Sequence, residues 1–79
     1  MQIRAELAVY PFHEGEVPPV YVQAASEALE GAGLSPEMGP LGQVVTGEEA
    51  SVLEALRAAQ HAAFAAGATR VALNLEREP

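Results

Sequence analysis

Histidine is the side chain that most readily gains or loses a proton near neutral pH, and the sequence has two histidines. His61 lies four residues after Arg57 and seven after Glu54, so the three side chains share one side of a helix. A histidine beside a carboxylate can act as a general acid or base. No serine, cysteine or second carboxylate is placed to complete a catalytic set. We therefore predict a surface ion-pair face here and no catalytic residue.

The other histidine, His13, lies in an acidic segment between two prolines, together with Glu14 and Glu16. Such a cluster can hold a metal ion weakly, but the spacing matches no metal-binding motif. The sequence has no cysteine, which excludes disulfides, thiolate nucleophiles and zinc–sulfur sites. We predict a solvated loop over residues 12–19, with no metal and no cofactor.

The segment Gly39–Gly42 has two glycines but lacks the glycine run, the lysine and the following helix of a phosphate-binding loop. Its composition predicts a tight β-turn. A turn with exposed N–H groups next to Thr46 would form the rim of a site for a small polar ligand. Tyr10 can stack on a flat ring, and Glu6 can accept a hydrogen bond from an amino group or offset a cation.

The charge balance excludes several partners. The 79 residues carry a formal net charge of −7, and the basic residues are four scattered arginines. No basic patch for nucleic acid or for anionic lipid can form from them. No apolar run reaches the ~20 residues of a membrane span, and the first residues do not resemble a signal peptide. We expect a cytoplasmic protein that binds neither nucleic acid nor membrane.

Strand patterns place the candidate residues. Apolar and polar side chains alternate over residues 2–10, as in a half-buried strand. Short strands are also expected over residues 34–38 and 43–46, and a last one over residues 69–77. Pro36 makes the second of these an edge strand.

Two helices separate these strands. The first is expected to begin near Pro19 and to end at Gly31 or Gly33, and the second to begin after a cap at Thr46 or Gly47 and to end at Gly67. Apolar residues at helical spacing predict the buried stripe of each helix. For the first helix these are Tyr21, Ala24, Ala25, Ala28 and Leu29; for the second they are Val52, Leu53, Leu56, Ala59, Ala63 and Phe64.

The order strand–helix–strand–strand–helix–strand over residues 1–79 predicts a single α+β domain, a ferredoxin-like βαββαβ sandwich. Its four-stranded antiparallel sheet should have the order 4-1-3-2, with both helices on one face. The other face would carry side chains of the first and last strands: Arg4, Glu6, Ala8, Tyr10, Arg70, Ala72, Asn74 and Glu76. This open face is either a solvated surface with cross-strand ion pairs or one that meets a ligand or a second subunit. We favour the second alternative, because so small a domain gains stability from association.

Several stretches occur in a recognisable order: residues 5–11 (AELAVYP), residues 37–48 (EMGPLGQVVTGE) and residues 59–71 (AQHAAFAAGATRV). Together they resemble the thiamine-binding-protein-like family of small, mostly uncharacterised proteins related to a thiamine/hydroxymethylpyrimidine-binding protein. The resemblance covers nearly the whole chain.

The resemblance implies a ferredoxin-like fold, homodimers or homotetramers, and a binding protein for thiamine or its pyrimidine moiety in place of an enzyme. An acidic chain with Glu6 and Tyr10 on an open face is compatible with a cationic, aromatic ligand. We expect ligand-binding residues at Glu6, Tyr10, Gly39, Gly42, Thr46 and Asn74.

Two other function classes are considered. One is a regulatory or interaction module that binds another small ligand, such as an amino acid. The other is an acylphosphatase, which would need an arginine in a phosphate-binding loop after the first strand. Residues 11–16 are acidic there and would repel phosphate.

Overall fold

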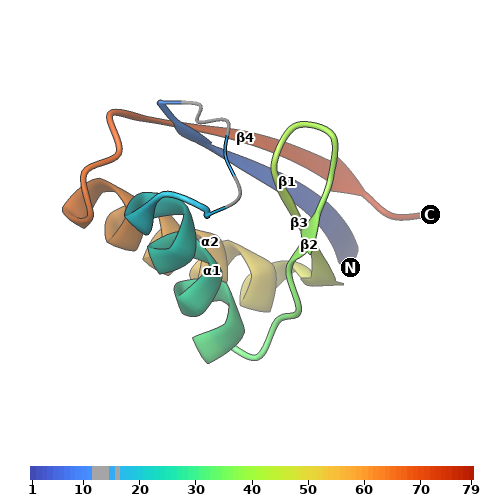
Figure 1. Cartoon of the computed structure of the whole chain (residues 1–79). Coiled ribbons are helices and arrows are strands. Elements are labelled where there is room, and N and C mark those ends of the chain that lie inside the picture. The colour runs from blue at the N-terminus through green and yellow to red at the C-terminus, as the bar shows by residue number, and fades with distance from the viewer. Residues whose placement is uncertain (12–14, 16) are drawn as a thin grey trace.

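The computed structural model describes residues 1–11, 15 and 17–79, so the predictions made for His13, Glu14 and Glu16 lie outside the described residues. Its elements follow the predicted order (Figure 1): β1 (Gln2–Tyr10), α1 (Val20–Gly31), β2 (Glu37–Met38), β3 (Gln43–Glu48), α2 (Glu49–Ala65) and β4 (Arg70–Arg77).

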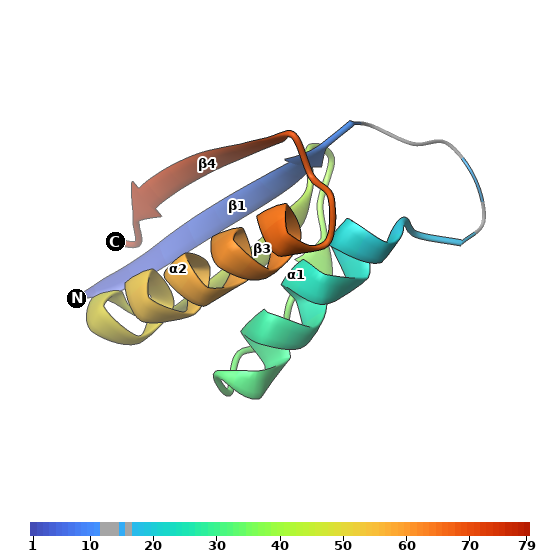
Figure 2. The same cartoon turned by 90° about the vertical axis from the view of Figure 1, so that its left-hand side faces the viewer.

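The four strands form one sheet in the order β2-β3-β1-β4, and every neighbouring pair is antiparallel. Both helices lie on the same face of the sheet, and the opposite face carries no helix from residues 1–11, 15 and 17–79 (Figures 1 and 2). This is the ferredoxin-like α+β sandwich that the sequence predicts, with the predicted strand order counted from the other edge.

The central strand β1 fixes the register of the sheet. Leu7 lies opposite Gln43 of β3 and Leu73 of β4, whereas Glu6 lies opposite Val44 and Asn74. Since side chains alternate along a strand, odd-numbered residues of β1 point to the helices and even-numbered residues point to the open face. The predicted alternation is therefore confirmed.

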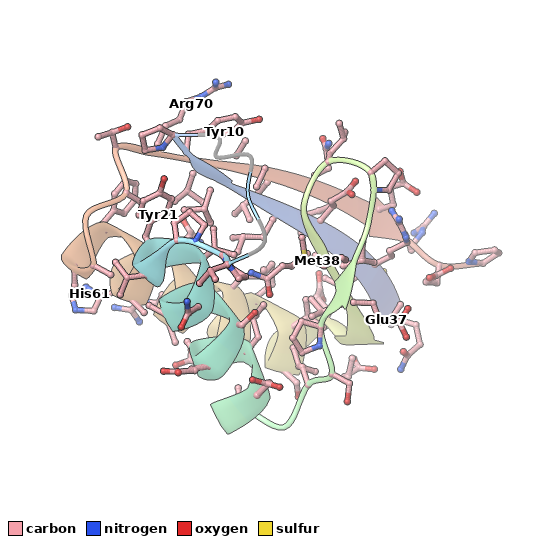
Figure 3. All side chains as sticks on the ribbon, in the orientation of Figure 1. Tyr10, Tyr21, Glu37, Met38, His61 and Arg70 are labelled. Atoms are coloured by element: carbon pink, nitrogen blue, oxygen red, sulfur yellow. The ribbon has the colours of Figure 1, made fainter. Side chains whose placement is uncertain are left out.

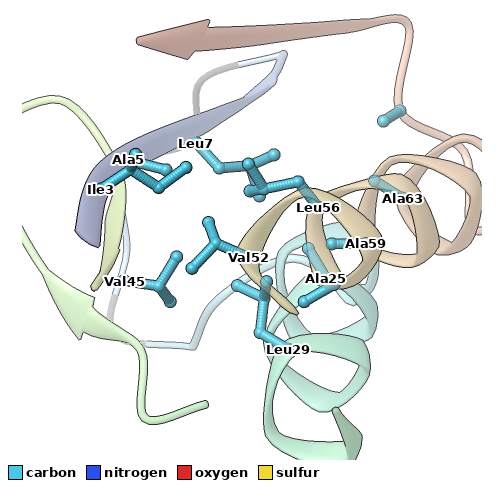
Figure 4. Packing of buried hydrophobic residues seen from close by; sticks show 12 residues of the cluster. Ile3, Ala5, Leu7, Ala25, Leu29, Val45, Val52, Leu56, Ala59 and Ala63 are labelled. Carbon is cyan, nitrogen blue, oxygen red and sulfur yellow. The ribbon is translucent and has the colours of Figure 1, made fainter. Parts of the chain in front are cut away.

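The core lies between the sheet and the two helices (Figure 4). Its largest fully buried side chains are Leu7, Leu29, Val45, Val52 and Leu56. Alanines complete it, and Figure 4 shows Ala25 of α1 next to Ala59 of α2. Small side chains at this contact let the two helices approach closely.

The helix ends depend on two glycines with left-handed backbone. Gly33 has φ +88° and Gly67 has φ +111°, and each lies two residues beyond the end of its helix. The predicted cap of α2 at Thr46 or Gly47 is wrong. Strand β3 continues to Glu48, because its last residues pair with Ile3 and Gln2, so the helix begins only at Glu49.

The predicted buried stripe of α2 is wrong at two positions. Leu53 is 44% exposed and Phe64 is 50% exposed, whereas Ala55, which the pattern did not include, is buried. Helix α2 packs on α1 as well as on the sheet, so its buried surface turns toward α1. At helical spacing, Leu53 and Phe64 fall on the flank opposite the buried Ala55.

No helix in the described part of the chain is long and apolar enough to cross a membrane.

Candidate functional site

The segment between β2 and β3 folds back as a tight turn against the open face of β1. The Gly39 N–H donates to the Gly42 carbonyl oxygen at 2.6 Å, which closes the turn. The Leu41 N–H donates to Oε2 of Glu6 at 3.2 Å. Glu6 is only 8% exposed, so its carboxylate is buried between β1 and the turn that it binds.

Close approach explains the two glycines of this turn. A Cβ atom on Gly42 would lie 2.2 Å from the Leu7 carbonyl oxygen and 3.0 Å from the Cα of Ala8. A Cβ atom on Gly39 would lie 2.7 Å from the Glu6 carboxylate. Any side chain at Gly42 would therefore push the turn away from β1, because backbone atoms cannot move aside.

A pocket of about 260 Å³ opens between this turn, the end of β1 and the start of α1. Its wall is mostly apolar and includes Val9, Tyr10, Val17, Val22, Met38 and Leu41. Both turn glycines also line it. A concave, mostly apolar pocket with a few polar groups is the usual form of a small-molecule site.

Gln43 supplies a buried polar group in the wall of the pocket. Its Oε1 accepts from the Ser26 hydroxyl, and its Nε2 donates to the Val22 carbonyl oxygen at 3.3 Å. Both partners belong to α1, so Gln43 ties the start of β3 to that helix. This connection keeps two walls of the pocket together.

Two tyrosines make contacts where the chain leaves β1: Tyr10 is its last residue, and Tyr21 lies in the first turn of α1. The guanidinium of Arg70 lies 4.7 Å from the ring centroid of Tyr10, a cation–π contact, and Figure 3 shows the two side chains together. The Tyr21 hydroxyl donates to the Pro11 carbonyl oxygen at 2.6 Å. These contacts fix the chain where it leaves β1, at the mouth of the pocket.

A shallow groove adjoins the pocket and shares Pro18, Val22 and Met38 with it. The groove continues along α1, where Glu27 and Glu30 line it. An apolar pocket thus leads directly to a surface with two carboxylates.

The structure brings together three of the six predicted ligand-binding residues at the pocket: Tyr10, Gly39 and Gly42. Glu6 lies beneath the turn and binds it. Thr46 and Asn74 are on the open face, opposite Arg4 and Glu6, and do not line the pocket.

The sequence pattern did not indicate the apolar wall or the buried Gln43. The signal for the wall was present, since Met38 and Leu41 are large apolar residues flanking a turn, where polar residues are usual.

The predicted ion-pair face on α2 does not form. Glu54, Arg57 and His61 are exposed, and among the residues that the structure describes none of them has an opposite charge within 4.0 Å. The ion pair found in the described part of the chain joins the Met1 amino group to Glu48 at 2.8 Å. In the same residues, no group of three or more His, Cys, Asp or Glu side chains is arranged to hold a metal ion.

Comparisons with known proteins agree with this fold. A family model described as thiamine-binding protein matches residues 5–77. A domain of unknown function from Bacillus cereus is 25% identical, with a TM-score of 0.69, over 95% of this chain and 72% of that one. A hypothetical protein from Methanocaldococcus jannascii is 26% identical, with a TM-score of 0.69, over 98% of this chain and 81% of that one.

A protein from Thermotoga maritima, provisionally assigned to thiamine biosynthesis or salvage, is 21% identical with a TM-score of 0.67. The match covers 96% of this chain and 81% of that one, and at this identity it shows the fold alone. The search of curated proteins found no match.

Proposed function

Because residues 5–77 match its model, the chain belongs to the thiamine-binding protein family, and we propose that it binds thiamine or the hydroxymethylpyrimidine moiety of thiamine without catalysing a reaction. Small-molecule binding is the function that gives this family its name. The observation that carries the proposal here is the pocket at the end of β1, between the Gly39–Gly42 turn and α1.

The size of the pocket favours a small ligand. Pockets that enclose drug-sized ligands measure roughly 300–1,000 Å³. A volume of about 260 Å³ lies just below that range, so a ligand no larger than a small drug would fit in it. The apolar wall would contact the faces of a pyrimidine ring, and Tyr10 at the mouth offers an aromatic surface for stacking.

The charges near the pocket support a cationic extension of the ligand. Glu27 and Glu30 line the adjoining groove, and the whole chain carries a formal net charge of −7. A pyrimidine seated in the pocket could direct a positively charged second ring along α1. Exposed carboxylates would add a modest, salt-sensitive attraction.

We propose binding without catalysis, because the described lining of the pocket lacks the usual nucleophiles and the histidine or carboxylate bases of a catalytic site. Its described lining holds no histidine, serine or cysteine, and the Glu6 carboxylate beneath the turn accepts a hydrogen bond from the Leu41 N–H. His61 belongs to α2 and lies outside the lining of the pocket.

Self-association completes the proposal. We expect the chain to act as a homodimer or homotetramer, since a domain of this size buries only about 60% of the surface that its unfolded chain exposes.

Isothermal titration of the purified chain with thiamine and with hydroxymethylpyrimidine tests the ligand. We expect heat from both at about 100 micromolar protein, the range of a −5 to −6 kcal/mol interaction. No heat with either compound would reject the proposal. Heat from an amino acid in a parallel screen would favour the regulatory-module alternative.

A matched pair of variants locates the ligand. Val22→Phe adds a ring inside the pocket and should abolish binding, whereas Val20→Phe adds the same ring at an exposed position outside the lining and should not. Circular dichroism of both variants shows whether the fold is kept. Equal affinities of two folded variants would place the ligand elsewhere.

A further inference from the structure

Strand β4 is a long, uncovered edge of the sheet. It is the outermost strand, runs for 8 residues, and contains no proline or glycine. Its charged residues, Arg70, Glu76 and Arg77, stand near its two ends, so residues 71–75 carry no charge. Natural proteins usually block such an edge with a charge, a bulge, a proline or a covering segment, because its free N–H and C=O groups can pair with another strand. The opposite edge strand, β2, has only 2 residues.

Apolar side chains are exposed beside this edge. On the helix side of β4, Leu73 is 37% exposed and Leu75 is 50% exposed. On α2, helical spacing puts Leu53 and Phe64 on the flank opposite Ala55 and Ala59, and Ala59 lies next to Ala25 of α1 (Figure 4). Helix α2, which contacts both α1 and β4, lies between them (Figure 2). Four large apolar residues therefore border the margin between α2 and β4, which no segment in the described part of the chain covers.

The backbone groups of β4 that remain free can be identified. The Glu78 N–H donates to the Gln2 carbonyl oxygen at 2.9 Å, which places the hydrogen bonds of even-numbered residues toward β1. In an antiparallel strand the two backbone groups of one residue point to the same neighbour, and the direction alternates. The N–H and C=O groups of Val71, Leu73 and Leu75 therefore point to the free edge.

We propose that a second copy of this chain pairs its own β4 antiparallel with this edge, about a twofold axis at Leu73, to form one continuous eight-stranded sheet. This β4–β4 contact would be the interface of the homo-oligomer in the proposed function, and it rests on the proposal that the chain associates with itself. Under the joined strands, the two α2 flanks that carry Leu53 and Phe64 would face each other.

The sequence of β4 is complementary to itself in this register. On the open face, Arg70 of each copy lies opposite Glu76 of the other, which gives two cross-strand pairs of opposite charge. On the helix face, Leu73 meets its own counterpart and Val71 meets Leu75. All three helix-face positions present free backbone groups, so each contact also brings hydrogen bonds.

The neighbouring registers fit less well. Residues directly opposite each other in an antiparallel pair have side chains on the same face of the sheet. The nearest alternative registers therefore place the twofold axis one residue away, at Ala72 or at Asn74. With the axis at Ala72, Arg70 would lie opposite Asn74. With the axis at Asn74, Val71 would lie opposite Arg77. Only the axis at Leu73 matches charge with charge and apolar with apolar.

Light scattering on the full chain tests the interface. At about 100 micromolar, where an association of micromolar Kd is nearly complete, we expect twice the 8.2 kDa chain mass, or a higher multiple of it. Leu73→Lys places two like charges face to face at the axis and should halve the observed mass. Val20→Lys, at an exposed apolar position on α1, is the matched control and should leave the mass unchanged.

A monomer mass for the unmodified chain overturns the inference. So does an unchanged mass for Leu73→Lys when circular dichroism shows the fold intact. If that variant does not fold, the charge variants below decide.

Charge reversal tests the register itself. Arg70→Glu makes both charged positions of the pairing acidic, and Glu76→Arg makes both basic, so each variant alone should give about half of its chains or more as monomer. Mixed in equal amounts, they should form a heterodimer, because every pair is then opposite in charge. Mixing that restores no dimer would overturn this register.

The outcome of the Leu73→Lys test is independent of the ligand test, since no residue of β4 lines the pocket. Arg70, which contacts Tyr10 in the pocket wall, is changed only in the register test. A dimer that binds neither thiamine nor the pyrimidine would reject the proposed ligand and keep this interface. A monomer that binds ligand would do the reverse.

Discussion

The sheet has two edges, β2 and β4, and they differ in length, in cover and in the side chains around them. β2 has 2 residues, and the turn that follows it folds onto the sheet and closes a pocket with α1. β4 has 8 residues, and its Leu73 and Leu75 are partly exposed on the face of the sheet that carries the helices. One edge is closed by its own chain, and the other is open.

The difference separates two tasks. A closed edge surrounds a small volume and suits a ligand, whereas an open edge offers a row of backbone groups and suits a strand. Because β3 and β1 lie between the two edges, each surface can change with little effect on the other. The following predictions test this separation.

The largest effect is expected from opening the closed edge with Gly42→Ala. The added Cβ would meet the backbone of Leu7 at 2.2 Å, so the turn must move. We expect a loss of about 1–3 kcal/mol of stability, or on the order of 10 °C in Tm, together with loss of ligand binding. Thermal denaturation measures the first and calorimetry the second.

Gly31→Ala is the control, since a Cβ at Gly31 meets nothing within 4 Å. It should be neutral or stabilising by up to about 1 kcal/mol, because alanine favours helix over glycine. A Gly42→Ala variant as stable as this control would mean that the turn does not depend on its contact with β1.

A smaller effect is expected at Glu6. Glu6→Ala removes the acceptor of the Leu41 N–H and should cost about 1–2 kcal/mol. Glu6→Gln keeps a side-chain oxygen and should recover part of the loss. Urea denaturation of the two variants measures the difference, and equal losses would show that the hydrogen bond contributes little.

The open edge is tested by dilution. If two chains join through β4, unfolding separates them, and Tm rises with protein concentration. For a chain of this length we expect about 3–6 °C for each tenfold increase in concentration. Scanning calorimetry of Leu73→Lys should show no such dependence. If the Tm of the unmodified chain does not change with protein concentration, β4 does not pair with a second copy in solution.

The smallest effect is expected at the middle of the open face. Thr46 and Asn74 lie outside the pocket lining, so alanine at either position should change thiamine affinity by no more than about twofold, within the usual effect of a surface change. Calorimetric titration measures it. A tenfold loss would show that the ligand reaches across the open face, as the sequence pattern predicts for these two residues.

Much of the fold follows from local patterns. The alternation in residues 2–10, the glycines after each helix and the order of elements predict the strand order that the structure has. Leu53 and Phe64 show where such patterns fail. Their spacing fits a buried stripe, but the packing of α1 against α2 rotates the helix, and spacing alone cannot give that rotation.

The site was less predictable. Tyr10, Gly39 and Gly42 could be selected by residue type, and the structure places them around one pocket. The role of Glu6 could not, because only the folded turn shows its carboxylate accepting from Leu41. Gln43 gave no signal either, since its partners Ser26 and Val22 lie on another element.

The alanine contact between α1 and α2 has a thermodynamic consequence. Unfolding exposes apolar surface and raises the heat capacity, by about 12–15 cal/mol/K per residue in ordinary proteins. Five of the core positions, Ala5, Ala25, Ala55, Ala59 and Ala63, expose only one methyl group each on unfolding. The heat-capacity change of this chain should therefore fall below that average, so its free energy of unfolding should curve less with temperature than that of an ordinary protein of the same length.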